Sequence, residues 1–130
     1  MSIRKIHQSQ VARRKAPSRF FRELVSHRKL QSKGIALRLV EVVPVRKAGP
    51  RHPHSHPGME EVIYVQKGSG EAWVDEKTAA IRPGDTILIP PGARHMMLNT
   101  GRGALVLLCA FSACDPENHY REHPEIAYSG

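Results

Sequence analysis

The sequence is short of aromatic residues, of cysteines and of long apolar runs. Phe, Trp and Tyr make up 5% of its 130 residues, and Cys109 and Cys114 are the two cysteines. No apolar run approaches the roughly 20 residues that span a membrane, and residues 1–15 lack the apolar centre of a secretory signal. This pattern indicates a reduced protein with free thiols, and a disulfide between the two cysteines is the alternative. We therefore expect a cytoplasmic protein that does not associate with membranes.

Acidic residues are scarce in the first part of the chain. Residues 1–51 contain 14 Lys or Arg and 2 acids, whereas residues 52–130 contain 6 Lys or Arg and 10 acids. The net charge of +8 is therefore the sum of +12 on residues 1–51 and −4 on residues 52–130. Zinc-finger spacing, a helix-turn-helix pattern and aromatic residues among the basic ones are all lacking, so we do not expect a nucleic-acid partner. We interpret residues 1–17 as a flexible basic arm, whose charge could also attract acidic small molecules.

The remaining residues, 18–130, fit one domain, with its core at about residues 35–112. Residues 18–25 fit either a short helix capped by Ser18 or an edge strand. From residue 35 onward, short apolar segments are separated by Gly and Pro turns, a pattern typical of strands. The expected strands cover residues 35–45, 62–65, 71–74, 86–89, 95–98 and 104–111. Because this spacing leaves no room for crossover helices, the predicted fold class is all-β and antiparallel.

A histidine-rich stretch precedes the second expected strand. His54 and His56 are two residues apart, so both imidazoles face the same side of an extended segment. Pro57-Gly58 then turns the chain, and Glu61 begins the next strand, where it can face the same interior. Imidazole nitrogen and carboxylate oxygen together suit a divalent first-row metal. Taken alone, this stretch is equally consistent with a surface feature that binds metal weakly.

A second segment favours a specific site. Residues 84–99 read G-x5-P-x-G-x2-H-x3-N, with His95 at the histidine position. The two Gly-containing turns of this segment fix the lengths of the strands on either side of them. The segment resembles the second motif of the cupin superfamily.

The first cupin motif has a counterpart around the histidine-rich stretch. His54-x-His56, four residues, Glu61, six residues and Gly68 resemble its latter part. Gly49 departs from the family pattern, because four residues separate it from His54 where the family has five. Only the opening turn is affected, since that glycine is not a ligand. The resemblance covers about residues 35–112.

The resemblance implies a small antiparallel β-barrel of the double-stranded β-helix, or jelly-roll, type and a homodimer. It also implies one divalent transition metal per chain, which could be Fe, Mn, Ni, Zn or Co. The implied metal ligands are His54, His56, Glu61 and His95. A register that uses His52 and His54, or Glu60 in place of Glu61, matches the family spacing less well.

Strand parity predicts what else lines the same cavity. The candidates, which share a strand face with the implied ligands, are His52, Ile63, Val65, Met97 and Asn99. An apolar cavity with one metal and few polar groups is typical of a small-molecule site.

Several other side chains carry weaker expectations. Tyr64 has the opposite parity and is expected to face outward or contact a partner. Trp73 is expected in the core or at an interface. His119 and His123 lie in the polar C-terminal tail and are expected to be solvated, and Arg38 is either exposed or an anion-binding group.

These features lead to two functional hypotheses. The first is a metal-dependent enzyme that acts on a small anionic or oxygen-rich metabolite, by dioxygenase, decarboxylase, lyase or isomerase chemistry. The second is a non-catalytic module that binds or senses a small ligand. The complete set of four implied ligands favours the enzyme.

Overall fold

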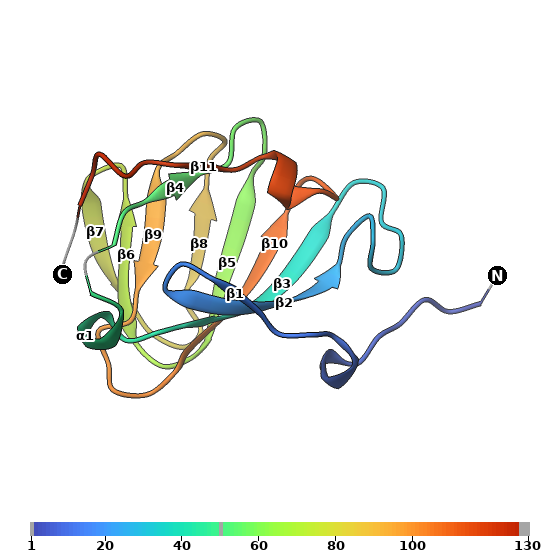
Figure 1. Ribbon diagram of the computed structural model, residues 1–130, viewed down its shortest axis with the longest axis horizontal. Coiled ribbons are helices and arrows are strands. Elements are labelled where there is room, and N and C mark those ends of the chain that lie inside the picture. Colours follow the sequence, from blue (N-terminus) through green and yellow to red (C-terminus); the bar gives the residue numbers. More distant parts are fainter. Residues whose placement is uncertain (1, 50, 128–130) are drawn as a thin grey trace.

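Two antiparallel sheets form the protein in the computed structural model, which describes residues 2–49 and 51–127 (Figure 1). The strand order is β1-β2-β3-β10-β5-β8 in the first sheet and β11-β4-β9-β6-β7 in the second. The strands are β1 (Arg14–Ala16), β2 (Arg19–Val25), β3 (Ala36–Val42), β4 (His54–Ser55), β5 (Glu61–Lys67), β6 (Gly70–Val74), β7 (Lys77–Ile81), β8 (Thr86–Ile89), β9 (His95–Leu98), β10 (Leu105–Phe111) and β11 (Arg121–Glu122). The short helices are η1 (Gln8–Gln10), α1 (Val45–Ala48) and η2 (Pro116–Asn118). No helix in the described ranges is long and apolar enough to cross a membrane.

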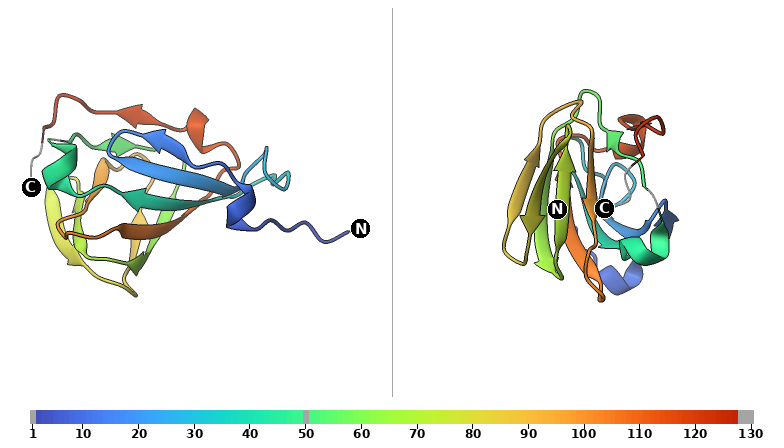
Figure 2. Two further views of the ribbon diagram at one scale, coloured as in Figure 1. Left: turned by 60° about the horizontal axis from the view of Figure 1, so that its bottom comes forward. Right: turned by 90° about the vertical axis from the view of Figure 1, so that its left-hand side faces the viewer.

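The all-β, antiparallel prediction is confirmed, but the predicted barrel is not closed. The chain changes sheet after β3, β4, β5, β7, β8, β9 and β10, which is the pattern of a jelly roll (Figure 2). Each ladder between these strands lies within one sheet, so the outermost strands of both sheets remain edges. The molecule is therefore a sandwich of two sheets.

The N-terminal segment contributes more to the fold than expected. Of the two alternatives for residues 18–25, the strand is correct: Phe21 pairs with Val40 on β3, and this non-local pairing decides between patterns that fit helix and strand alike. The predicted arm is partly wrong, because Arg14–Ala16 forms β1 and Arg14 pairs with Phe21. Before η1 the chain runs away from the sheets (Figure 1).

The main hydrophobic core lies between the two sheets. Its buried residues include Val40, Val42, Ile63, Val65, Ile89, Met97, Leu105 and Leu107. Burying each such side chain contributes about 1.5–3 kcal/mol. A second cluster covers the other face of the five-stranded sheet, where Trp73 packs with Met96 and Leu98. Trp73 is therefore a core residue.

Gly68 lies where two strands approach too closely for a side chain. A Cβ there would be 2.3 Å from the Ala104 carbonyl oxygen and 2.9 Å from Leu105 Cα, and its φ of +84° lies in the left-handed region. We expect Gly68→Ala to lower the free energy of unfolding by about 2–4 kcal/mol, because backbone atoms must move. Urea denaturation measures the change. The control is Gly34→Ala, whose Cβ would meet nothing within 4 Å; an equal loss in both variants would contradict this account.

Candidate metal centre

The three predicted histidine ligands converge from neighbouring strands of the five-stranded sheet. His54 on β4 pairs with His95, the first residue of β9. His56 directly follows β4, and Pro57-Gly58 then turns the chain toward β5. Glu61 begins β5 in the opposite sheet. The structure thus brings together the side chains that the two motifs implied as ligands.

The ligating atoms of this cluster are close enough to share one ion. One nitrogen from each of His54, His56 and His95 lies within 4.8 Å of the other two. Glu61 Oε1 lies 3.2 Å from His56 Nε2 and 3.0 Å from His95 Nε2. Glu61 and His95 are buried at 4% and 1% exposure, so bulk water does not solvate the carboxylate. A buried carboxylate needs a compensating positive charge or hydrogen bonds at this position.

Backbone carbonyls determine the tautomers of two of the histidines. His56 Nδ1 lies 2.8 Å from the His119 carbonyl oxygen, and His95 Nδ1 lies 2.9 Å from the Ala93 carbonyl oxygen. A carbonyl oxygen only accepts, so each Nδ1 carries the proton and donates it. In the neutral rings, both Nε2 lone pairs therefore point at Glu61 Oε1. Acceptors that face one another repel unless a proton or a cation lies between them, and the Nδ1–H···O=C bonds are typical of metal-ligating histidines.

The ionisation of the cluster also suits metal binding. Burial, with the neighbouring His95, holds the pKa of His54 well below its ordinary value, so that ring is neutral. Burial raises the pKa of Glu61, but the side chains of His56 and His95, whose Nε2 atoms lie beside its carboxylate, outweigh burial and lower the pKa to about 2, so the carboxylate is ionised. An unprotonated imidazole and an ionised carboxylate are the forms that bind divalent cations, and His54 and Glu61 are in these forms. The residues present fit the metal that the motifs imply.

A cavity of about 60 Å³ adjoins the cluster. Its wall combines apolar side chains with three arginines; those that bear on the chemistry are Arg19, Arg38, Val40, Arg51, Ile63, Met97, Cys109, Phe111 and Tyr120. A single water requires roughly 10–15 Å³ of such space, so the cavity holds only a small molecule.

The arginines give the cavity a positive charge. Arg38 is neutralised by Glu23, whose Oε1 lies 2.9 Å from Arg38 Nη2. Arg51 is 6% exposed and donates to the Met97 carbonyl, and no acidic side chain in the described ranges forms an ion pair with it. Burial, followed by repulsion from Arg19, lowers the pKa of Arg51 to about 10, so it stays charged at neutral pH. A buried cation without an acidic partner favours an anionic ligand.

The predicted lining residues divide into two groups. Ile63 and Met97 line the cavity. The expectation for Val65, Asn99 and His52 needs correction, since none of them lines it. Val65 lies deeper in the core. Asn99 stabilises the turn after β9 by donating to the Val42 and Gly103 carbonyls, and His52 faces Glu122 at 3.3 Å. The expected strand face does not include His52 or Asn99, because β4 begins at His54 and β9 stops at Leu98. Val65 shares the buried face of Glu61 and Ile63 on β5, but lies beyond the cavity.

The C-terminal tail also needs correction. His123 is 9% exposed and its Nε2 lies 2.8 Å from Ser55 Oγ, so it is not solvated as expected. His119 is half-buried and its carbonyl orients His56. Sequence reasoning missed this role, as well as the roles of Arg51 and Tyr120 in the cavity wall. No periodic pattern marks residues 115–123, and only the pairing of β11 with β4 brings them to the site.

Comparisons with known proteins agree with this geometry. The Cupin domain family matches residues 38–111, which is more than half of the chain. An uncharacterised protein of Methanocaldococcus jannaschii is 36% identical over 95 residues, which cover 72% of this chain and 71% of the relative. Oxalate oxidase GF-2.8 of Triticum aestivum is 29% identical over 91 residues, 64% of this chain and 39% of the relative.

Solved structures share the fold. Oxalate decarboxylase from Bacillus subtilis superposes with a TM-score of 0.78 at 24% identity, over 94% of this chain and 32% of that chain. This chain thus spans about a third of the decarboxylase and about two fifths of the wheat oxidase. The family match over residues 38–111 includes His54, His56, Glu61 and His95. The predicted resemblance is confirmed, and the chain belongs to the cupin family.

Proposed function

We propose that this protein is a metal-dependent cupin enzyme that acts on a small carboxylic acid. In this proposal His54, His56, Glu61 and His95 hold one divalent transition metal. The observation that carries it is the meeting of His56 Nε2 and His95 Nε2 with the Glu61 carboxylate at 3.2 and 3.0 Å, while the Nδ1 atom of each ring faces a backbone carbonyl. A cation between these groups would turn mutual repulsion into coordination. The cavity beside them contains Arg51, which forms no ion pair with an acidic side chain of the described residues.

The size and charge of the cavity support an anionic substrate of roughly two to four carbon atoms. Arg51 and Arg19 line the cavity, and neither forms an ion pair with an acidic side chain in the described part of the chain. Two relatives carry oxalate, a small dianion, in their names.

The chain's own residues would bind and orient the acid. Arg51 is positioned to hold one carboxylate by charge-assisted hydrogen bonds, because its guanidinium is fixed by the Met97 carbonyl. Ile63, Met97 and Phe111 exclude water from the cavity, which strengthens this contact. The bound ion would supply Lewis acidity or O₂ chemistry at the substrate's oxygen atoms.

Metal analysis combined with turnover tests the proposal. Protein purified without a metal-affinity tag is analysed for Fe, Mn, Ni, Zn and Co, and then assayed with short mono- and dicarboxylic acids with and without O₂. One equivalent of metal and turnover that chelation abolishes would support the enzyme. A bound metal with a tightly held ligand and no turnover would support the alternative, a non-catalytic binding module. Failure to bind any of these ions would contradict both.

We further propose a homodimer, formed through the outer face of the six-stranded sheet. Val62, Tyr64 and Leu88 are 39%, 42% and 57% exposed on this face. Leu88 pairs with Val62, and Tyr64 pairs with Leu108, so these apolar side chains lie side by side across three neighbouring strands. An apolar sheet face of this extent is typical of an interface.

Tyr64→Arg is expected to convert the dimer to a monomer. Two like charges would be buried without partners at the interface, at a cost of about 2–5 kcal/mol. Sedimentation equilibrium measures the mass of the variant and of the wild type. The matched control is Thr78→Arg, which changes an exposed residue on β7 of the other sheet. A monomeric wild type would end this proposal.

A cytoplasmic location is also proposed. Cys109 and Cys114 are both free, and free thiols persist in a reducing compartment. Fractionation of cells that express the protein at its natural level tests this location.

A further inference from the structure

A second pocket adjoins the metal cavity on its outer side. Arg19, Arg51, His54 and Tyr120 line both spaces, and the outer one is completed by Pro17, Ser18, His52 and Glu122. The same four side chains thus lie between the two spaces. We call the boundary that these four side chains form the mouth of the cavity.

Two of these residues approach the mouth from opposite ends of the chain. Arg19 begins β2, directly after the β1–β2 turn, and Tyr120 directly precedes β11. The Tyr120 ring centroid lies 5.3 Å from that of His54 and 6.0 Å from that of His56. Its hydroxyl donates to Glu122 Oε1 at 2.8 Å. Burial raises the pKa of Tyr120, and the neighbouring Arg19 acts against that rise. Arg19 and Tyr120 line both the cavity and the outer pocket.

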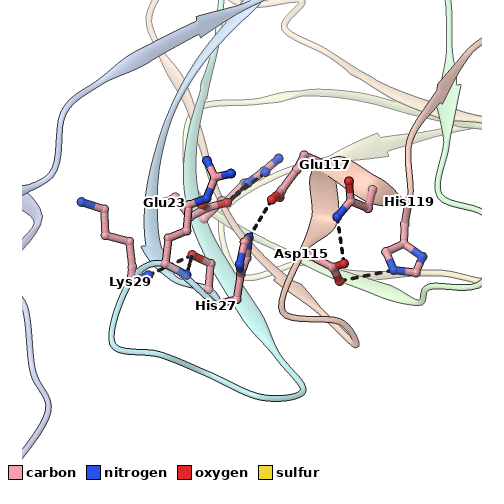
Figure 3. Close-up of polar contacts among 10 residues, drawn as sticks. Glu23, His27, Lys29, Asp115, Glu117 and His119 are labelled. Atoms are coloured by element: carbon pink, nitrogen blue, oxygen red, sulfur yellow. Dashed lines mark hydrogen bonds and ion pairs between the residues drawn. The ribbon is translucent and has the colours of Figure 1, made fainter.

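The C-terminal segment that carries Tyr120 is fixed on its N-terminal side. His27 Nε2 lies 2.8 Å from Glu117 Oε1 (Figure 3), and the His27 amide donates to the Cys114 carbonyl. Asp115 contacts both Asn118 and His119, which closes the turn around η2 (Figure 3). The segment thus reaches the mouth from a fixed anchor.

The same segment is also fixed at and after Tyr120. The preceding carbonyl, of His119, accepts from His56 Nδ1. After Tyr120, β11 pairs with β4, and His123 contacts Ser55. Tyr120 therefore lies between fixed points, and its ring is held over the ligand histidines.

We propose that Tyr120 is a specificity-determining residue, whose ring narrows the mouth opposite Arg19 and limits the size of the molecules that reach the metal cavity. This inference rests on the proposed small-molecule site. Short carboxylic acids fit within the metal cavity, on the inner side of the Tyr120 ring. A longer carboxylic acid must extend between Tyr120 and Arg19 into the outer pocket. Enlarging the mouth should therefore admit bulkier molecules.

Access to Cys109 tests the mouth without any metal. Its thiol lines the inner cavity and is 3% exposed. The experiment measures the rate at which methyl methanethiosulfonate and the bulkier dithionitrobenzoate modify Cys109 in metal-free protein, in a Cys114→Ser background. We expect Tyr120→Ala to speed modification by about tenfold or more, with a larger gain for the bulkier reagent, since the cavity opens without unfolding.

Two controls separate the ring from other effects. Tyr120→Phe keeps the ring and removes the hydroxyl, so its rate should stay within about twofold of the wild type. Urea denaturation of each variant gives the unfolded fraction, through which Cys109 could also react. Equal rates in Tyr120→Ala and Tyr120→Phe, or a gain no larger than the gain in unfolded fraction, would overturn the proposal. Tyr120→Leu serves if the alanine variant does not fold.

Ligand length gives a second readout, in Co(II)-loaded protein. Oxalate, malonate, succinate and glutarate are titrated against the Co(II) absorption bands. In the wild type we expect the affinity to fall by about tenfold or more from oxalate to glutarate, and in Tyr120→Ala by less than about threefold. An unchanged fall in Tyr120→Ala would overturn the role of Tyr120. Failure of the wild type to bind Co(II) or any of the acids would instead contradict the proposed function, and the Cys109 rates would still decide the inference.

Discussion

Glu61→Gln is expected to abolish stoichiometric metal binding without destabilising the metal-free protein. The amide of Gln would donate to the Nε2 lone pairs of His56 and His95, whose Nδ1 protons are held by backbone carbonyls. Repulsion between acceptors would then become hydrogen bonding. The same change removes the only carboxylate oxygen in the cluster, so metal affinity should fall by more than about 100-fold. Glu61→Gln therefore keeps or raises the stability of the metal-free protein, while it lowers the affinity for the metal.

Thermal unfolding with and without added Co(II) or Mn(II) measures both effects. The wild type should gain stability with metal, and Glu61→Gln should not. If Glu61 were instead the structural partner of protonated histidines, breaking this buried pair would cost the metal-free protein about 3–5 kcal/mol. That loss would contradict the assignment of Glu61 as a ligand. Glu60→Gln, which changes the exposed neighbouring residue, is the matched control.

Arg51→Met is expected to remove carboxylate binding and to leave metal binding in place. Arg51 is the buried cation of the cavity, and its loss takes away a charge-assisted contact of about 2–5 kcal/mol. Removal of a positive charge near the cluster favours cation binding, so the metal content should not fall. Some folding stability will be lost, because the Met97 carbonyl loses its donor.

Calorimetric titration of Co(II)-loaded protein with oxalate measures this effect. We expect the Kd to rise by roughly thirtyfold or more. Arg94→Met is the control, since Arg94 is paired with Asp75 away from the cavity. Equal oxalate affinity in Arg51→Met and the wild type would mean that Arg51 does not bind the substrate.

The grouping of His54, His56, Glu61 and His95 could be predicted from the sequence because its determinants are local. The two-residue spacing of His54 and His56 sets their common face, and the turns before Glu61 and His95 set where the next strands begin. The spacing of the two cupin motifs indicates the same four residues. The structure adds the tautomers of His56 and His95, which depend on carbonyls that spacing does not locate.

The cavity wall could not be predicted, because distant segments build it. Arg19 and Tyr120 are about a hundred residues apart and meet only when β1–β2 and β11 pack at the same mouth. Closure of a barrel likewise depends on whether edge strands pair, which alternation of apolar residues does not specify. Residues 18–25 illustrate the same limit, since their pattern allows two structures and pairing with β3 selects one.

The position of Glu61 in one sheet and of the three histidines beside the other has a consequence for the dynamics of the whole sandwich. An ion bound to all four would act as a cross-link between the two layers, which otherwise hold together by apolar contact across an unclosed edge. At a free metal concentration of 100 times the Kd, this linkage adds about 2.7 kcal/mol to the stability of the folded state. The metal concentration would then determine how often the two layers separate transiently. The rate of amide hydrogen exchange on β4 and β5 would measure this opening.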